Sequence, residues 1–285
     1  MSARLSGFDR NKLAEALKAD IDAFCVAKYD DGPRSHLGAS IIGEKCLRKL
    51  VYVHRWMHRE RFDGRMLRLF NRGHKEEFRF VEWLNGIGAN VREIAPDGKQ
   101  FRINGVHGHY GGSLDGKIVL PERYNLPVDF LLEMKTHNDK SFKKLVKDGV
   151  RQSKPMHYNQ MCNYGAADGH SYAIYLAINK NDDGLYVEVV ELDLALGKRN
   201  NEERARAAIG ATELPPKIAA TEAYESCKFC SMAGICHRGE PVDVNCRSCA
   251  NSSPVEDGQW YCEKWKAQIP KEAIPVACGA WKQFE

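Results

Sequence analysis

The sequence predicts a mixed α/β domain followed by a small cysteine-rich appendage. Apolar strand-like segments alternate with amphipathic helical segments over residues 38–240, which is the pattern of a layered α/β core. Seven of the ten cysteines lie after residue 225. A chain of 285 residues can form one large core and a smaller unit. We therefore expect an N-terminal helical segment (1–37), a core (38–240) and an appendage (241–285).

Composition and charge indicate an intracellular globular protein that contacts a polyanion. Hydrophobic residues make up 43% of the chain and charged residues 28%, which is ordinary for a soluble domain. We expect no transmembrane helix and no signal peptide, because long apolar runs are absent. The net charge is only +4, but residues 34–79 hold 12 Lys/Arg against 5 Asp/Glu, and residues 140–154 hold 6 against 1. These basic segments are either a nucleic-acid surface or two solvated helix faces.

Local patterns place the secondary structure along the chain. The first helix has an apolar stripe of Leu13, Ala16, Leu17, Ile21 and Phe24 that is expected to pack against the core. Further helices are expected over 38–59, with Ser40 as its N-cap, and over 66–85, 141–152, 155–167 and 194–209. Strands are expected within 91–104 and over 114–120, 128–134, 171–179 and 185–192.

The stretch 113–135 contains the candidate catalytic hairpin. Asp115 lies near the start of one predicted strand, and Glu133 and Lys135 lie two residues apart on the next. Residues two apart on a strand point to the same face. Two carboxylates suit Mg²⁺ or Mn²⁺, and a lysine beside the metal can orient or deprotonate water. By itself, the pattern also fits a solvated surface hairpin.

Two helices add polar residues on either side of the hairpin. His74 and Glu77 share a face of the helix over 66–85, so both can reach a metal held by the hairpin. Gln160 and Tyr164 share a face of the helix over 155–167.

The chain resembles the PD-(D/E)XK nuclease superfamily, because three of its motifs follow in the same order: Asp115, then Glu133-x-Lys135, then Gln160-x-x-x-Tyr164. The similarity is to its RecB-type branch, which includes lambda exonuclease and YqaJ-like phage recombinases, and it covers residues 38–195. Gly73-His74 with Glu76 or Glu77 is similar to the helix motif of that branch, and the choice between the two glutamates stays open. Leu114 departs from the name-giving proline.

The resemblance implies a role for each of these residues. Asp115, Glu133, His74 and the backbone carbonyl of Met134 would bind the divalent metal, and a second metal ion stays open. Lys135 would position or activate water. Gln160 and Tyr164 would hold the scissile phosphate or the water.

A first set of cysteines lies at the C-terminal end of the expected core. Cys227, Cys230 and Cys236 are one thiolate short of a four-cysteine site, and Cys46 can supply the fourth. This arrangement resembles the [4Fe–4S] staple of AddB-type and CRISPR-adaptation nucleases, which also have an arginine close after the upstream cysteine, as Arg48 is here. Zinc in the same ligands and His237 in place of Cys46 are the alternatives.

A second set lies in the appendage. Cys246 and Cys249 have zinc-knuckle spacing, and Cys262 and Cys278 complete a tetrahedral Zn²⁺ site. About 45 residues bury little core, so a metal would contribute to folding.

The sequence thus predicts a Mg²⁺- or Mn²⁺-dependent deoxyribonuclease, an exonuclease of a phage or mobile element working in recombination, repair or DNA degradation. Its partners would be single-stranded DNA or duplex ends, with a single-strand annealing or binding protein as a further candidate. We expect it in the cytoplasm, of a bacterial host cell if it is phage-encoded. The alternatives are a non-catalytic nucleic-acid-binding protein and a metal-stapled subunit of a repair complex. Cleavage mode, polarity and oligomeric state stay open.

Overall fold

The computed structural model describes residues 9–126 and 128–285 as a mixed α/β fold. Its centre is a five-stranded sheet in the order β2-β5-β6-β7-β8. The strands are β2 (Asn90–Arg92), β5 (Gly116–Val119), β6 (Asp129–His137), β7 (Tyr172–Asn179) and β8 (Leu185–Glu191). Only β6 and β7 pair in parallel, with Glu133 opposite Tyr175. The predicted mixed sheet is therefore confirmed.

Helices cover both faces of this sheet. On one face, α3 (Gly64–Gly86) buries Phe80 and Leu84 against Met134 of β6 and its neighbours. On the other face lie α4 (Asp139–Ser153) and α5 (Pro155–Asp168), whose apolar side chains pack on Leu131 and Tyr175. Successive residues of β6 thus point to opposite faces of the sheet, as in any β-strand. Glu133 and Lys135 are two and four residues after Leu131, so their side chains point to the same face as Leu131, which is the face covered by α5.

A second, three-stranded sheet adjoins the first, in the order β1-β4-β3. It contains β1 (Leu37–Gly38), β3 (Arg102–Gly105) and β4 (Tyr110–Ser113). β1 pairs in parallel with β4, with Leu37 opposite Tyr110. This pairing joins the N-terminal part of the chain to the strand that leads into Asp115.

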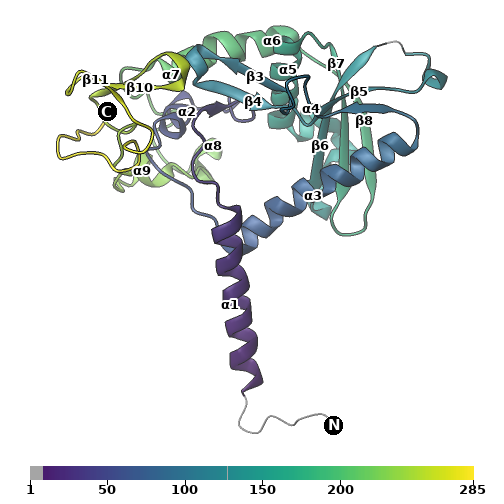
Figure 1. Cartoon of the computed structure of the whole chain (residues 1–285), viewed down its shortest axis with the longest axis horizontal. Helices are drawn as coiled ribbons and strands as arrows, with labels where there is room; N and C mark the ends of the chain where they lie inside the picture. The colour runs from purple at the N-terminus through teal and green to yellow at the C-terminus, as the bar shows by residue number, and fades with distance from the viewer. Residues whose placement is uncertain (1–8, 127) are drawn as a thin grey trace.

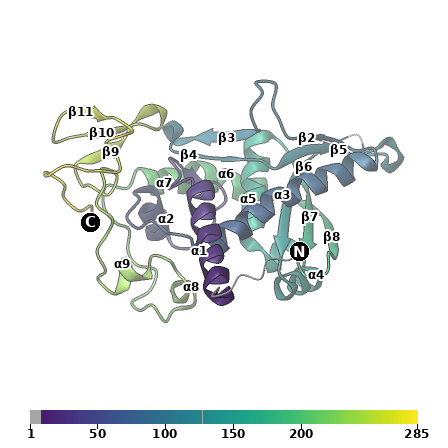
Figure 2. The ribbon, with the colours of Figure 1, turned by 60° about the horizontal axis from the view of Figure 1, so that its bottom comes forward.

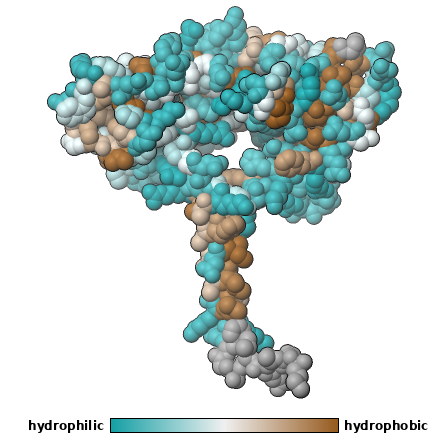
Figure 3. Space-filling view, viewed as in Figure 1, coloured by the Kyte–Doolittle hydropathy of each residue, from teal (hydrophilic) through white to brown (hydrophobic). Residues whose placement is uncertain are grey.

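The first helix, α1 (Arg10–Tyr29), does not pack as the sequence predicted. It projects from the body, and only its C-terminal half contacts α3 (Figure 1). The apolar stripe is half exposed and forms a brown band along the helix in Figure 3. Cys25, on another side of the helix, is the buried residue. The periodicity predicted the helix correctly, but the stripe does not face the core.

Two other helices differ from expectation. The segment expected as one helix over 38–59 is helical only in α2 (Leu47–His54), with Cys46 rather than Ser40 at its N-cap. The segment expected as one helix over 194–209 has a π-helical turn (Asn200–Arg204) between α6 (Leu194–Arg199) and α7 (Ala205–Ile209).

The C-terminal part contains two short helices, α8 (Glu225–Lys228) and α9 (Ala233–His237), and a small sheet in the order β11-β10-β9 (Figure 2). Its strands are β9 (Ser252–Pro254), β10 (Trp260–Cys262) and β11 (Ala267–Ile269). In the part of the chain that is described, no helix has both the length and the apolar character needed to cross a membrane.

Two buried arginines connect this C-terminal unit to the body. Arg55, just after α2, donates hydrogen bonds to the carbonyls of Arg247, Cys249 and Ser252 and lies 3.5 Å from the ring centre of Phe284. Arg247 donates to the carbonyl of Ser35 and to His54 Nδ1. The unit is therefore docked through the end of α2 by buried, charge-assisted contacts.

Candidate active site

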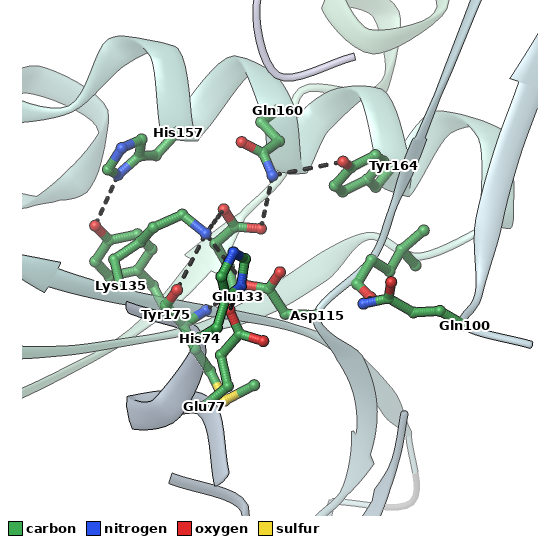
Figure 4. A network of polar contacts seen from close by, with 12 residues as sticks. His74, Glu77, Gln100, Asp115, Glu133, Lys135, His157, Gln160, Tyr164 and Tyr175 are labelled. Carbon is green, nitrogen blue, oxygen red and sulfur yellow. Dashed lines mark hydrogen bonds and ion pairs between the residues drawn. The ribbon is translucent and has the colours of Figure 1, made fainter. Parts of the chain in front are cut away.

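The hairpin brings Asp115, Glu133 and Lys135 together (Figure 4). Asp115 lies in the turn between β4 and β5, and its Oδ2 accepts hydrogen bonds from the Met134 amide at 2.8 Å and from Lys135 Nζ at 3.1 Å. Lys135 Nζ is also 2.6 Å from Glu133 Oε1 and donates to the Met134 carbonyl at 3.0 Å. The three side chains and the Met134 carbonyl thus surround one point, as the sequence predicted.

Burial perturbs both charged groups of β6. Glu133 is 1% exposed, and burial, opposed by Lys135 and aided by Asp115, raises its pKa to about 8. Burial disfavours the charged form of Lys135, but Glu133 and Asp115 outweigh it and raise the lysine pKa. The ammonium therefore stays protonated, and the site has a surplus of carboxylates in a desolvated place.

Gln160 and Tyr164 approach this cluster from α5. Gln160 Nε2 donates to Glu133 Oε2 at 3.3 Å, and it is 3.5 Å from the Tyr164 hydroxyl. Tyr164 fits because residue 112 is glycine: a Cβ there would lie 2.7 Å from the tyrosine hydroxyl oxygen. The predicted pair on one helix face is thus beside the hairpin carboxylates.

On α3, the structure distinguishes the two candidate glutamates. His74 Nδ1 is 3.4 Å from Glu77 Oε1, and Figure 4 shows both beside Asp115 and Lys135. Burial first, and then the charge of Asp115, raise the pKa of Glu77. Glu76 instead makes an ion pair with Arg79, at 2.8 Å. Glu77 is therefore the carboxylate that adjoins the site.

Sequence reasoning missed a chain of three polar residues next to Lys135. The hydroxyl of Tyr175 is 2.8 Å from His157 Nδ1 and 2.9 Å from His137 Nε2. Burial lowers the pKa of His157 to about 3 and that of His137 to about 4, so both are neutral at physiological pH. The spacing held a signal: His137 is two residues beyond Lys135 on β6, and His157 is three before Gln160 on α5.

These residues open onto one large cavity. It has a volume of about 1060 Å³, and His74, Glu77, Lys135 and His157 line one side of it. The segment 29–36 lines the opposite side. The candidate site therefore lies at the wall of a cavity and not on an open surface hairpin.

Each cysteine set surrounds a cavity of its own. Cys46, Cys227, Cys230 and Cys236 line one, together with His237. Burial raises the pKa of Cys227, and the other three sulfurs add to the effect. The fold thus joins Cys46 to cysteines more than 180 positions later in the chain.

Cys246, Cys249, Cys262 and Cys278 line the second cysteine cavity. Burial is the largest cause that raises the pKa of Cys246, and the charges of the three other sulfurs raise it further. The Trp265 indole N–H donates to Cys278 Sγ at 3.5 Å, and the Lys282 amide donates to Cys249 Sγ at 3.5 Å. Donors directed at sulfur stabilise thiolates.

Neither cysteine set, nor the group of carboxylates at the hairpin, has the geometry of a closed metal site. Over residues 9–126 and 128–285, no group of three or more His, Cys, Asp or Glu side chains is arranged to hold a metal ion. What the structure provides is four thiols around each of two cavities and a group of carboxylates at the hairpin.

No family model matches this chain, and no curated protein matches it. Among solved structures, the fold is similar to an alkaline exonuclease, LHK-Exo, from Laribacter hongkongensis, with a TM-score of 0.44 and 17% identity over 67% of this chain and 91% of that chain. The same exonuclease in complex with dAMP gives 0.44 and 18%, with the same coverage. A structure described as SSO0001 gives 0.41 and 16%, over 79% and 96%. All three TM-scores are below 0.5.

Proposed function

We propose that this protein is a divalent-metal-dependent deoxyribonuclease of the PD-(D/E)XK type, and that it acts as an exonuclease. The observation that carries the proposal is the meeting of Asp115, Glu133 and Lys135, with Lys135 at the wall of a large cavity and Gln160 bonded to Glu133. A solvated surface hairpin, the main alternative reading of this sequence pattern, would not bury Glu133 or enclose Lys135.

The donor set fits Mg²⁺ or Mn²⁺. Asp115, Glu133, Glu77 and the Met134 carbonyl are hard oxygen donors. Burial first, and then the neighbouring carboxylates, raise the pKa values of Glu133 and Glu77. His74 is beside Glu77 and is a further candidate ligand. A divalent ion bound here would supply Lewis-acid activation of the phosphodiester and of water.

The chain's own residues would divide the remaining work. Lys135, held protonated by two carboxylates, would donate a hydrogen bond to orient the attacking water. Gln160 donates a hydrogen bond to Glu133 and lies beside the Tyr164 hydroxyl. Both side chains would donate to the phosphate of a bound strand. A non-catalytic DNA-binding protein would not need a buried carboxylate beside a buried ammonium.

A cleavage assay tests the proposed function. The purified protein with labelled DNA and Mg²⁺ or Mn²⁺ should degrade the DNA, and EDTA should stop the reaction. Substrates labelled at the 5′ or the 3′ end report polarity and distinguish terminal from internal cleavage. DNA that stays intact with both metals would contradict the proposal.

Glu77 and Glu76 form a matched pair for the metal site. We expect Glu77→Gln to raise the Mg²⁺ concentration needed for half-maximal cleavage by about 10- to 100-fold, because one oxygen donor loses its charge. Glu76→Gln should leave that concentration unchanged and weaken only the ion pair with Arg79. A metal titration of both variants measures this, and equal effects would remove Glu77 from the ligand set.

We propose further that Cys46, Cys227, Cys230 and Cys236 hold a [4Fe–4S] cluster. The support is their common cavity, which joins the start of α2 to α8 and α9. Zinc in the same thiolates is the alternative, and His237, at the same cavity, is the alternative to Cys46.

For the second set, Cys246, Cys249, Cys262 and Cys278, we propose zinc. The support comes from Arg55 and Arg247, which are 3% and 1% exposed. Among the described residues, no carboxylate shifts the pKa of either guanidinium. The sulfur of Cys249 is the group whose charge raises the pKa of Arg55 against the effect of burial. Zinc with four thiolates carries a formal charge of −2, so it would compensate these two buried cations.

Arg247→Met tests this compensation. Without one cation, the tetrathiolate is less well neutralised, and we expect zinc to be lost to a competing chelator about tenfold faster. Arg238→Met is the control, because Arg238 is exposed and pairs with Glu222 and Glu240. Zinc release followed with a metallochromic dye gives the rates, and equal release from both variants would separate Arg247 from the metal.

A further inference from the structure

The chain runs around the cavity at the candidate active site, and the cavity stays open to solvent. His74, Glu77 and Lys135 lie at one wall, and residues 29–36 form the wall across from them. Figure 3 shows the molecule hollowed through at this position, above the junction of α1 and α3. A strand that reaches Lys135 through this opening would pass inside the ring of chain.

Segment 29–36 and Phe62 of segment 55–63 line this cavity, and together we call the two segments the double strap. The Arg59 guanidinium is 2.9 Å from Asp30 Oδ2, so the two segments are tied to each other. The Trp56 indole N–H donates to the Arg34 carbonyl at 2.9 Å. The Arg59 amide also donates to Asp243 Oδ2, at 2.6 Å, which fastens the double strap to the C-terminal part.

Both ends of the double strap are anchored in ordered structure. Segment 29–36 runs directly into β1, which pairs with β4. Segment 55–63 runs into α3, which is buried against β6 through Phe80 and Leu84. Where the two segments meet α1 and α3, Arg68 pairs with Asp22. Opening the enclosure would require separation of α3 from the sheet, which means loss of core contacts.

The size of the cavity suits a single strand. Its volume of about 1060 Å³ is near the upper end of the volumes that hold one drug-sized ligand, roughly 300–1,000 Å³. This volume accommodates a few nucleotides of one strand.

The chemistry of the wall also fits a single strand. Arg34, Arg102 and Lys180 line the cavity and can contact backbone phosphates. Phe62 and Phe70 line it as well, with ring centres 5.0 Å apart, and aromatic faces stack with bases regardless of sequence.

We propose that one DNA strand threads end-first through the enclosure behind the double strap, so that the enzyme requires a free end of single-stranded DNA. This inference rests on the proposed nuclease function and adds the topology of the substrate. The same enclosure would explain an exonuclease mode without assembly of a ring from several chains.

The test compares a circular single-stranded DNA with the same DNA made linear. With Mg²⁺ or Mn²⁺, the full-length protein should degrade the linear strand and leave the circle intact, and it should also spare a linear strand blocked by streptavidin at both ends. Cleavage of the circle at the rate of the linear strand would overturn threading while the nuclease function stands. If neither DNA is cut, the nuclease function fails, and threading fails with it.

A binding measurement separates the enclosure from the outer surface. In an Asp115→Ala background, which prevents cleavage, Phe70→Ala should weaken binding of a labelled oligonucleotide about tenfold, the loss expected for one base stack. Phe78→Ala is the control, because Phe78 is on the same helix, is 72% exposed and is not part of the cavity wall. Equal effects of the two substitutions would contradict passage of the strand through the cavity.

Discussion

Replacement of Asp115 by alanine is expected to abolish DNA cleavage by the purified protein. Asp115 Oδ2 accepts hydrogen bonds from both the Met134 amide and Lys135 Nζ, and it is a candidate metal ligand. Its loss removes one carboxylate from the donor set and releases the ammonium that it positions. We expect the rate to fall by on the order of 10³-fold, which corresponds to about 4 kcal/mol of lost transition-state stabilisation.

Two further variants make this result specific. Asp115→Asn keeps the shape of the side chain and its hydrogen-bond acceptor, so it should fold like the wild type and still be inactive. Asp97→Ala removes an exposed carboxylate that accepts only from the nearby Lys99 amide, and it should retain full activity. Thermal unfolding shows whether each variant is folded. If wild type and Asp115→Ala cut DNA equally, the assigned mechanism is wrong.

The second large effect is expected from Cys230→Ser. Protein purified anaerobically should be brown and contain iron, and this variant should lose both, because serine replaces one of four sulfur ligands. The cluster would connect Cys46 to the 227–236 segment across a long loop of chain. By analogy with a covalent cross-link of such a loop, its loss should lower the free energy of unfolding by about 4 kcal/mol.

Cys25→Ser is the control for the cluster, because Cys25 lies on α1, outside both cysteine cavities. It should keep the colour and the iron content. Iron analysis and thermal unfolding provide the measurements. A colourless anaerobic preparation of wild type that contains only zinc would show that the iron–sulfur assignment is wrong and would favour zinc in the same ligands.

Much of the candidate site could be predicted from local patterns. The E-x-K spacing required Glu133 and Lys135 to share one face of a strand, and the structure brings both to Asp115. The four-residue spacing of Gln160 and Tyr164 likewise set their common helix face. Such relations depend only on the strand and helix periods, so they hold in any fold that keeps the element.

Tertiary packing decided which neighbours each helix or strand face meets, which the periods do not specify. Glu76 and Glu77 are neighbours on one helix, and only the packing of α3 against the sheet puts Glu77 near Asp115 and leaves Glu76 with Arg79. The apolar stripe of α1 had the period of a buried helix, yet it is half exposed. Periodicity shows which residues share a face, but not which neighbour that face meets.

From the sequence by itself came the mixed α/β class, the candidate catalytic hairpin, its flanking helices, three cysteines of the first set and the four of the second, because spacing along the chain carries each of them. The tertiary structure alone decided that His137, His157 and Tyr175 adjoin Lys135 and that the double strap borders the site. It also brings Cys46, which the resemblance implied as the fourth thiolate, to the cavity of the late cysteines. These features join residues far apart in sequence. Their proximity depends on how the layers pack, which no local pattern encodes.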